Sequence, residues 1–262
     1  MKLSKLTFQH NDSREVRLGL FQPNPSPRQE SIFDNFCYDF SCGITTLVAK
    51  NGVGKSTLIQ CIVDEYILGL KGKGSGMVVF NNPQASLDPL IRGNSSKTTL
   101  KHISQKPDHS LLPWYNSIDN LKVIASFEKR NVDIERYIKN LEQFRIKPTQ
   151  KIESLSGGQK QIVNILKTLA FEPNLILMDE PFSALDLENS LKLKKLILEW
   201  QKENQATIIL ISHSIDDILE LSDTILILHN RPVEIHSVLK NNFELRERNK
   251  TEIMKFLDPK TS

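Results

Sequence analysis

The sequence lacks any long hydrophobic run. Its longest uninterrupted aliphatic stretches, such as residues 208–211 and 225–228, contain only four residues. A membrane-spanning helix needs about 20 apolar residues, so we expect no segment of this chain to cross a bilayer. The first residues are not followed by the apolar segment of a secretory signal. We therefore expect a protein that stays in the cytoplasm.

Cysteine is scarce and the net charge is small. The three cysteines, Cys37, Cys42 and Cys61, form no CxxC pair, which predicts reduced thiols rather than a disulfide framework. The net charge is +3, from 34 basic and 31 acidic residues. Nucleic-acid-binding proteins carry clustered lysine and arginine, so this balance argues against a nucleic-acid partner. Hydrophobic residues make up 39% and charged residues 25%, as in ordinary globular proteins and unlike disordered chains.

Short apolar strands alternate with helical patterns at both ends of the chain. We expect strands at residues 45–49, 77–80, 100–104, 175–178, 206–211, 224–228 and 233–238, and helices at 58–70, 159–171, 187–202 and 215–221. The pattern of residues 118–144 is mostly helical. Residues 3–8 and 16–20 alternate and predict a β-hairpin. Apolar strands without alternation are typical of a parallel sheet covered on both faces.

We therefore predict an α/β fold with a parallel sheet and a small antiparallel β portion from the N-terminus. The mainly helical block, about residues 106–168, would be an inserted subdomain. The predicted division is a domain of residues 1–240 followed by a helical tail of residues 241–262.

The first chemical motif lies between a predicted strand and a predicted helix. It consists of Asn51, Gly52, Val53, Gly54, Lys55, Ser56 and Thr57. Glycines let consecutive backbone N–H groups turn toward one anion, and the helix start adds its positive end. In the phosphate-loop pattern GxxxxGK[ST], the lysine reaches the β- and γ-phosphates and the hydroxyl binds Mg²⁺. Ala49 replaces the first glycine. The alternative is an ordinary glycine-rich turn.

Two carboxylates, Asp179 and Glu180, follow the apolar strand at residues 175–178. In phosphate-loop enzymes a strand-end aspartate helps to hold the metal. The next acid could then orient a water molecule against the γ-phosphate. Without the phosphate loop, the same pair would indicate only the start of a helix.

Residues 155–159, with the sequence LSGGQ, precede another predicted helix. Ser156 and the two glycines would form a second anion site at the start of that helix. Two such sites serve one nucleotide only if two chains cooperate. The alternative is a simple helix cap with Ser156 at the N-cap position.

With these motifs in order, the sequence resembles the ATP-binding cassette (ABC) family over nearly its whole length. The matching features are NGVGKST at residues 51–57, Gln105, LSGGQ at 155–159, LILMDE at 175–180, and His213. Residues 183–186 are similar to the family's D-loop. The resemblance implies a RecA-like P-loop NTPase fold that binds ATP and Mg²⁺ and hydrolyses the ATP.

The resemblance also implies a role for each matching residue. Glu180 would be the catalytic base, His213 would contact the γ-phosphate, and Gln105 would sense Mg²⁺ and the γ-phosphate. Lys55 would also be catalytic, and metal contacts would come from Ser56, Gln105 and Asp179. Contacts to the ATP of the opposite subunit, or across the dimer, would come from Ser156, Gly157, Gly158, Gln159 and Asp186.

A finer resemblance concerns residues 111–114, 181–186 and 230–232, which are similar to the ATPase subunits of nitrate-, sulfonate- and taurine-type importers. Residues 111–114 could equally serve to pack the helical block. The chain departs from the family at Ala49, at Ile162, at Lys167 and Thr168, where arginines are common, and at Ser212 and Ser214. Phe21 is the candidate for the aromatic ring that stacks on adenine.

The resemblance implies an ATPase subunit of an importer, located at the cytoplasmic face of the cell membrane. Its partners would be a second ABC ATPase subunit in a head-to-tail dimer, transmembrane permease subunits, and an extracytoplasmic substrate-binding protein. The main alternative is a soluble ABC-type ATPase that is not coupled to a permease. An exporter cassette and a non-catalytic nucleotide-gated regulator are the others.

Overall fold

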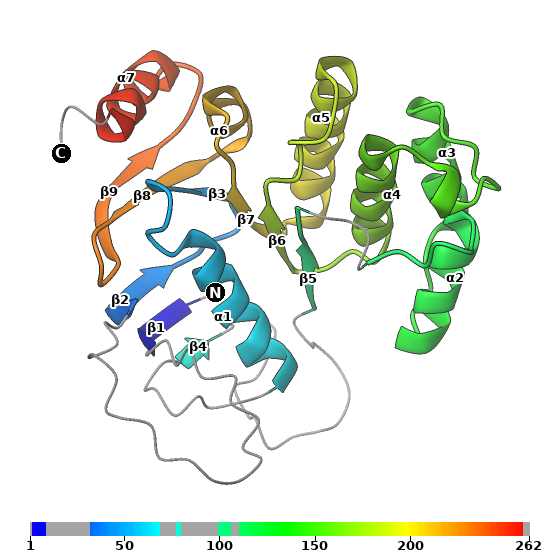
Figure 1. The fold of residues 1–262 in the computed structure, drawn as a ribbon, viewed down its shortest axis with the longest axis horizontal. Coiled ribbons are helices and arrows are strands. Elements are labelled where there is room, and N and C mark those ends of the chain that lie inside the picture. Colours follow the sequence, from blue (N-terminus) through cyan, green and yellow to red (C-terminus); the bar gives the residue numbers. More distant parts are fainter. Residues whose placement is uncertain (1, 9–31, 69–76, 80–98, 106–109, 259–262) are drawn as a thin grey trace, which may run out of the picture.

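The structure of the chain, a computed structural model, describes residues 2–8, 32–68, 77–79, 99–105 and 110–258. Among these residues the strands form two sheets (Figure 1). The main sheet has the strand order β5-β6-β7-β3-β8-β9, and the small sheet has the order β2-β1-β4. The strands are β1 Lys2–Phe8, β2 Phe33–Asp39, β3 Gly43–Val48, β4 Met77–Val79, β5 Leu100–Ile103, β6 Leu175–Asp179, β7 Thr207–Ile211, β8 Thr224–His229 and β9 Glu234–Lys240.

Five neighbouring strands of the main sheet run parallel, from β5 to β8, and β9 pairs with β8 in the antiparallel direction. Residues along β3 are buried on both faces, whereas β9 alternates between half-buried and exposed residues, as an edge strand does. Because the parallel strands share one direction, their carboxyl ends meet at one edge of the sheet. The segments that follow β3, β5, β6 and β7 therefore gather there.

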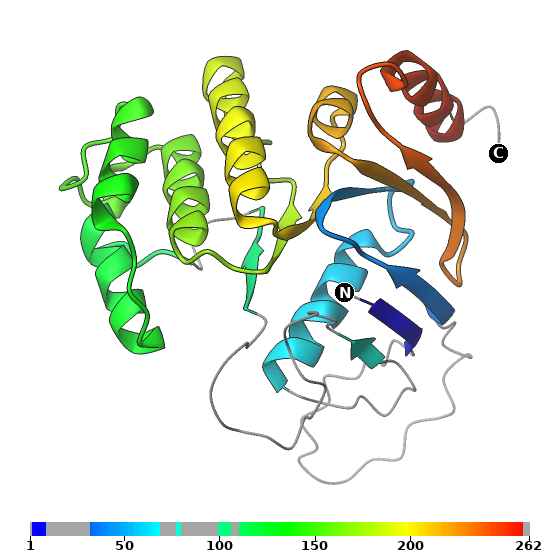
Figure 2. The ribbon, with the colours of Figure 1, turned by 180° about the vertical axis from the view of Figure 1, so that it is seen from behind.

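The helices cover both faces of this sheet. They are α1 Lys55–Leu68, α2 Ser117–Glu128, α3 Ile134–Gln143, α4 Gly157–Ala170, α5 Leu187–Asn204, α6 Ile215–Leu221 and α7 Arg246–Leu257. Helix α1 lies on one face, α5 to α7 follow one another along the other face, and α2 to α4 gather beyond β5 (Figures 1 and 2). None of the helices in the described part of the chain is long and apolar enough to span a membrane.

Alternation along the strands divides the core. Ile176 and Ile208 belong to a buried cluster with α2 to α5, and their neighbours Leu177 and Ile209 belong to a cluster with α1. Successive strand residues point to opposite faces, so each strand serves both clusters. Ile253 on α7 is fully buried in a third cluster with residues of α6 and β8.

The predicted α/β architecture with its small antiparallel part is confirmed, but several elements differ from expectation. β1 pairs with β2 and β4; its expected hairpin partner, residues 16–20, lies outside the described residues. The pattern missed β2 because Asp34, Asn35 and Asp39 disfavour strands, although Phe33 and Phe36 are buried. The division into residues 1–240 and 241–262 stays a prediction.

The structure refines two of the helical predictions. The helical pattern at residues 118–144 splits into α2 and α3, because Lys129 adopts a left-handed backbone with φ 53° and ends α2. Helix α1 begins at Lys55 rather than at residue 58. The lysine and the two residues after it are thus part of the first helical turn.

Candidate functional site

The phosphate loop joins β3 to α1 at the carboxyl edge of the sheet. Gly52 and Gly54 adopt φ values of 81° and 128°, which side chains rarely tolerate. A Cβ atom on Gly54 would also lie 2.9 Å from Cγ2 of Ile32. The first N–H groups of α1 have no partner within the helix and carry its positive end. The loop is therefore a preformed cradle for an anion.

Lys55 is buried within this loop. Its ammonium donates to the carbonyl oxygen of Ala49 at 2.7 Å and makes a longer contact of 3.4 Å with the carbonyl of Lys50. Burial lowers the pKa of Lys55, and the charges of Glu180 and Asp179 act against that shift. Ala49 takes part through its backbone, and its methyl group is buried in the core. The departure from glycine at this position thus leaves the carbonyl available.

Three predicted residues converge where β5, β6 and β7 end. Gln105 Nε2 donates to Oε2 of Glu180 at 3.2 Å. On the other side, His213 Nε2 lies 3.0 Å from Oε1 of the same carboxylate. Both oxygens of Glu180 are therefore engaged by groups from neighbouring strands.

The backbone of Glu180 is held in an unusual conformation. Its φ is 47°, in the left-handed region that is costly for residues other than glycine. The Glu180 N–H donates to the carbonyl of Ile211 at 2.9 Å, and the Ser183 hydroxyl donates to the Glu180 carbonyl at 3.0 Å. These bonds aim the side chain between Gln105 and His213.

A polar network supports the loop that carries His213. The Ser212 hydroxyl donates to Oδ2 of Asp217 at 3.2 Å and accepts from the N–H of Ser214 at 3.1 Å. Ser214 caps α6 by accepting from the N–H of Asp217 at 3.2 Å. Lys194 on α5 is buried and pairs with Oδ1 of Asp217 at 3.0 Å. Both serines that depart from the family pattern thus brace the loop.

The donors available for Mg²⁺ are oxygens from separate segments. Asp179 ends β6 beside Glu180 and is half-buried, and Ser56 is exposed in the first turn of α1. The described residues contain no group of three or more His, Cys, Asp or Glu side chains that could hold a metal alone. Mg²⁺ usually binds one or two carboxylates together with substrate phosphates. The Asp179 carboxylate and the Ser56 hydroxyl, beside a loop that can bind phosphates, are ligands of this kind.

The signature segment forms the start of α4. Ser156 accepts from the N–H of Gln159 at 3.2 Å, and the Gln159 side chain accepts from the N–H of Ser156 at 3.1 Å. This reciprocal capping box is the cap expected as the alternative. Ser156 and Gly157 are nevertheless exposed. Helix α4 packs beside β5, and β6 and β7 separate β5 from the strand that carries the phosphate loop.

The two glycines of this segment have different surroundings. A Cβ on Gly158 would lie 2.8 Å from the carbonyl oxygen of Ala184, whereas nothing lies within 4 Å of a Cβ on Gly157. The helix start therefore rests on the backbone of the segment that follows Glu180.

We expect Gly158→Ala to destabilise the protein by about 1–3 kcal/mol, because the new methyl group must push the Ala184 backbone away. Gly157→Ala is the matched control and should be neutral or slightly stabilising, since a helical alanine loses less entropy than glycine. Thermal unfolding of both variants measures the difference. Equal melting temperatures would contradict the contact.

Asp186 caps the next helix, α5. It accepts from the N–H of Asn189 at 2.9 Å and from its side-chain amide at 2.7 Å. These hydrogen bonds lower the pKa of the exposed Asp186 carboxyl. Its contact across a dimer stays a prediction, and Phe21 lies outside the described residues.

Sequence reasoning missed the role of the β8–β9 hairpin. Both Nε and Nη2 of Arg231 donate to the carbonyl of Gly52, the Nε at 2.9 Å. The segment at residues 230–232 was noted only for its family resemblance. No local sequence pattern predicts that Arg231 contacts a loop almost 180 residues earlier in the chain.

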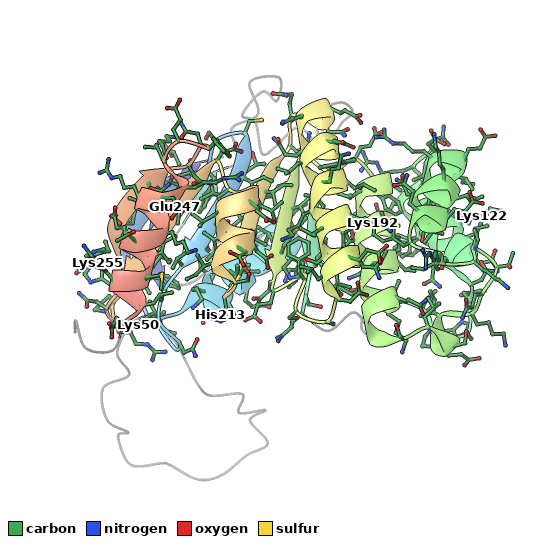
Figure 3. The ribbon with its side chains drawn as sticks, turned by 90° about the horizontal axis from the view of Figure 1, so that it is seen from above. Lys50, Lys122, Lys192, His213, Glu247 and Lys255 are labelled. Carbon is green, nitrogen blue, oxygen red and sulfur yellow. The ribbon has the colours of Figure 1, made fainter. Side chains whose placement is uncertain are left out.

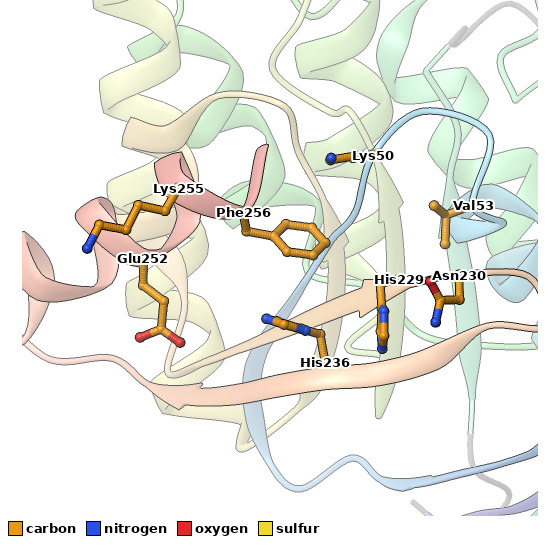
Figure 4. A pocket seen from close by; sticks show the side chains of 8 residues that line it. All are labelled: Lys50, Val53, His229, Asn230, His236, Glu252, Lys255 and Phe256. Atoms are coloured by element: carbon orange, nitrogen blue, oxygen red, sulfur yellow. The ribbon is translucent and has the colours of Figure 1, made fainter. Parts of the chain in front are cut away.

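A pocket of about 700 Å³ lies beside the phosphate loop, between that loop, the hairpin and α7 (Figure 4). Lys50 and Val53 line its loop side. The rings of His229, His236 and Phe256 form a row, with centroids 5.1 Å apart at each step.

Lys50, which precedes the phosphate loop, and His213 lie along one edge of the molecule (Figure 3).

The sequence model described as ABC transporter matches residues 37–183. The chain belongs to the ABC transporter family. The match includes the phosphate loop, Gln105, the signature segment and both carboxylates, and it ends before His213. As a member of this family, the chain is an ATPase that binds ATP with Mg²⁺. The predictions of family, fold, cofactors and enzyme class are therefore confirmed.

Known proteins refine this placement. The aliphatic sulfonates import ATP-binding protein SsuB of Bacillus cereus is 28% identical, over 82% of this chain and 80% of its own length. The nitrate transport protein NasD of Klebsiella oxytoca is 31% identical, over 84% and 81%. Among solved structures, a dimeric ATP-binding cassette bound to ADP and Pi has a TM-score of 0.66 at 20% identity, over 92% of this chain and 98% of that one. At this level of identity, the structural match shows a shared fold and nothing more.

Proposed function

We propose that the chain is the ATP-hydrolysing subunit of an importer-type ABC transporter that works as a head-to-tail dimer at the cytoplasmic face of the membrane. The observation that carries the catalytic part is the convergence of Gln105 and His213 on the Glu180 carboxylate. The sulfonate import protein and the nitrate transport protein among its relatives support the transport part.

The phosphate loop would bind the triphosphate. Backbone N–H groups at the start of α1 would donate to the phosphates, and Lys55 would exchange its bond with the Ala49 carbonyl for the β- and γ-phosphates. Mg²⁺, held by Ser56, Asp179 and phosphate oxygens, would neutralise the charge that develops there. Lys55 is buried, so its charge acts in a site of low dielectric constant.

Glu180 would orient the attacking water molecule. Its carboxylate accepts from the water and aims one lone pair of the water oxygen at the γ-phosphorus. Gln105 holds one oxygen of the carboxylate and His213 the other, so the carboxylate cannot rotate away. His213 is half exposed and in this proposal would also contact the γ-phosphate. Positioning and charge neutralisation thus supply most of the catalysis.

The signature segment supports a dimer. Ser156 and Gly157 are exposed at the start of α4, and strands β6 and β7 lie between β5, beside which α4 packs, and the strand that carries the phosphate loop of the same chain. A second subunit in head-to-tail orientation brings this segment to the γ-phosphate bound on its partner. ATP then favours the closed dimer and hydrolysis reopens it, because only a ligand with different affinities for two states drives a change between them.

Exposed apolar side chains support a permease partner. Trp114 is 62% exposed, and Val123 and Phe127, one turn apart on α2, are 40% and 90% exposed. Large apolar groups gathered on a surface mark docking sites. These side chains lie on the segment and helix that follow Gln105 in the sequence, and Gln105 itself contacts the catalytic carboxylate.

The test is co-purification of tagged protein with the substitution Glu180→Gln from gently solubilised native membranes in the presence of ATP. We expect mass spectrometry to identify a multi-span permease. The wild-type protein without ATP is the control. A soluble partner with nothing from the membrane would overturn the transporter function and leave the ATPase chemistry intact.

A further inference from the structure

The loop that carries His213 is held by a hydrogen-bond network that ends on α5. The Ser212 hydroxyl donates to Oδ2 of Asp217 at 3.2 Å and accepts from the N–H of Ser214 at 3.1 Å. These two serines flank His213 in the sequence. On its other oxygen, Oδ1, Asp217 accepts from the Lys194 ammonium at 3.0 Å. The residues on both sides of His213 are therefore tied to one lysine on a different helix.

We propose that Lys194 is a positioning residue for His213. Through Asp217 it holds the loop in the conformation that brings Nε2 of His213 within 3.0 Å of Glu180. The inference rests on the catalytic roles proposed for His213 and Glu180. The network itself forms in the chain without nucleotide.

The position of His213 depends on the backbone that carries it. Its side chain is 51% exposed, so packing contacts hold only part of the ring. Ser212 and Asp217, by contrast, are 7% and 8% exposed. Their hydrogen bonds lie in a site of low dielectric constant, where they are stronger than in water. The buried network thus fixes the backbone from which the exposed ring projects.

Helix α5 gives Lys194 a rigid support. Leu193 and Ile197, on the same helix, are buried in the core cluster that also contains Leu210 of β7. Strand β7 leads directly into the loop of His213. The helix and the strand are therefore packed together, and Lys194 joins α5 to α6, its neighbour on the same face of the sheet (Figure 1).

Two carboxylates compensate the buried charge of Lys194. Its side chain is 6% exposed, and the ammonium also lies 2.5 Å from Oε2 of Glu220. Burial lowers the pKa of Lys194, but its hydrogen bonds with Glu220 and Asp217 act in the opposite direction, and the net shift is upward. Removing one member of a buried ion pair leaves the other charge uncompensated. Loss of Lys194 therefore favours rotation of Asp217 toward water, which breaks its bond to Ser212.

The experiment compares four single substitutions in the full chain, labelled with ¹⁵N-histidine. Lys194→Met removes the ammonium and keeps the length of the side chain. Its control is Lys195→Met, because Lys195 lies on the same helix with its side chain 80% exposed. Ser212→Ala breaks the network and leaves the ion pair intact. Its control is Ser222→Ala, another buried serine, whose hydroxyl donates to the carbonyl of Ile218 at 2.6 Å.

The NMR signal of the His213 ring reports its position in the absence of nucleotide. The Nε2 resonance, assigned by its loss in His213→Ala, belongs to the atom that contacts the catalytic carboxylate. We expect this resonance to move in both test variants and to stay at its wild-type position in both controls. The resonances of His229 and His236 should not move, which excludes a general loss of structure. An unmoved His213 resonance in Ser212→Ala would overturn the inference, even if Lys194→Met fails to fold.

ATP turnover separates a positioning role from a merely structural one. We expect Lys194→Met to lower kcat about 10–100-fold and Ser212→Ala to lower it about three- to tenfold, with ATP affinity within about threefold of the wild type. Both controls should keep the wild-type kcat. Unchanged kcat in both test variants would overturn the positioning role. If the His213 resonance moves as expected but the wild-type chain hydrolyses no ATP, the network stands and the proposed function fails.

Discussion

Glu180→Gln is expected to lower kcat for ATP hydrolysis by about 10²–10⁴-fold while ATP still binds. Glutamine keeps the size of the side chain and can still contact Gln105 and His213, but it cannot act as a base. Bound ATP should then accumulate together with the closed dimer. Phosphate release measures turnover, nucleotide titration measures binding, and gel filtration in ATP measures dimerisation.

The matched control for this prediction is Glu188→Gln. Glu188 lies exposed in the first turn of α5 and pairs with Lys192, away from the three convergent side chains. Its substitution should leave turnover close to that of the wild type. Unchanged turnover in Glu180→Gln would remove Glu180 from the mechanism.

Lys55→Ala is expected to weaken ATP affinity by about 10–100-fold. Hydrogen bonds to charged groups contribute about 1.5–3 kcal/mol, and each 1.4 kcal/mol is a factor of ten. The loss should appear in binding itself, since Lys55 lies within the loop that cradles the phosphates. Titration with a fluorescent ATP analogue measures it.

Lys192→Ala on the surface of α5 controls for the loss of one positive charge. Lys192 pairs with Glu188 on the same helix. ATP affinity should stay at the wild-type value in this variant. If Lys55→Ala also bound ATP as tightly as the wild type, residues 51–57 would not be a phosphate loop.

The parts of the site that follow from the sequence are those with local causes. The loop turns at positions with positive φ, and glycine occupies them. Ser156 and Gln159 are three residues apart in sequence and form a capping box at the start of one helix. The approach of Gln105 and His213 to Glu180 follows from the parallel direction of their strands. A strand pattern with motifs at its ends therefore predicts this convergence.

The parts that escaped prediction depend on contacts between distant residues. Arg231 holds Gly52 through a hairpin that carries no motif for the contact. Strand β2 forms although Asp34 and Asn35 disfavour it, because pairing with β1 and burial of Phe33 and Phe36 outweigh local preference. Lys167 was noted only as a departure from the family, and its bond to Ser110 is visible only in three dimensions.

The order of the strands fixes the spacing of the catalytic segments independently of the outer helices. The phosphate loop, His213, Glu180 and Gln105 follow β3, β7, β6 and β5, four adjacent strands. Neighbouring strands are spaced about 4.8 Å apart, so the four attachment points span about 14 Å, a width that the backbone ladder itself sets. Changes in α2, α3 or α7 can give the protein new docking surfaces without altering that width. Substitutions on these helices can therefore change which partner the protein binds without changing the geometry that hydrolyses ATP.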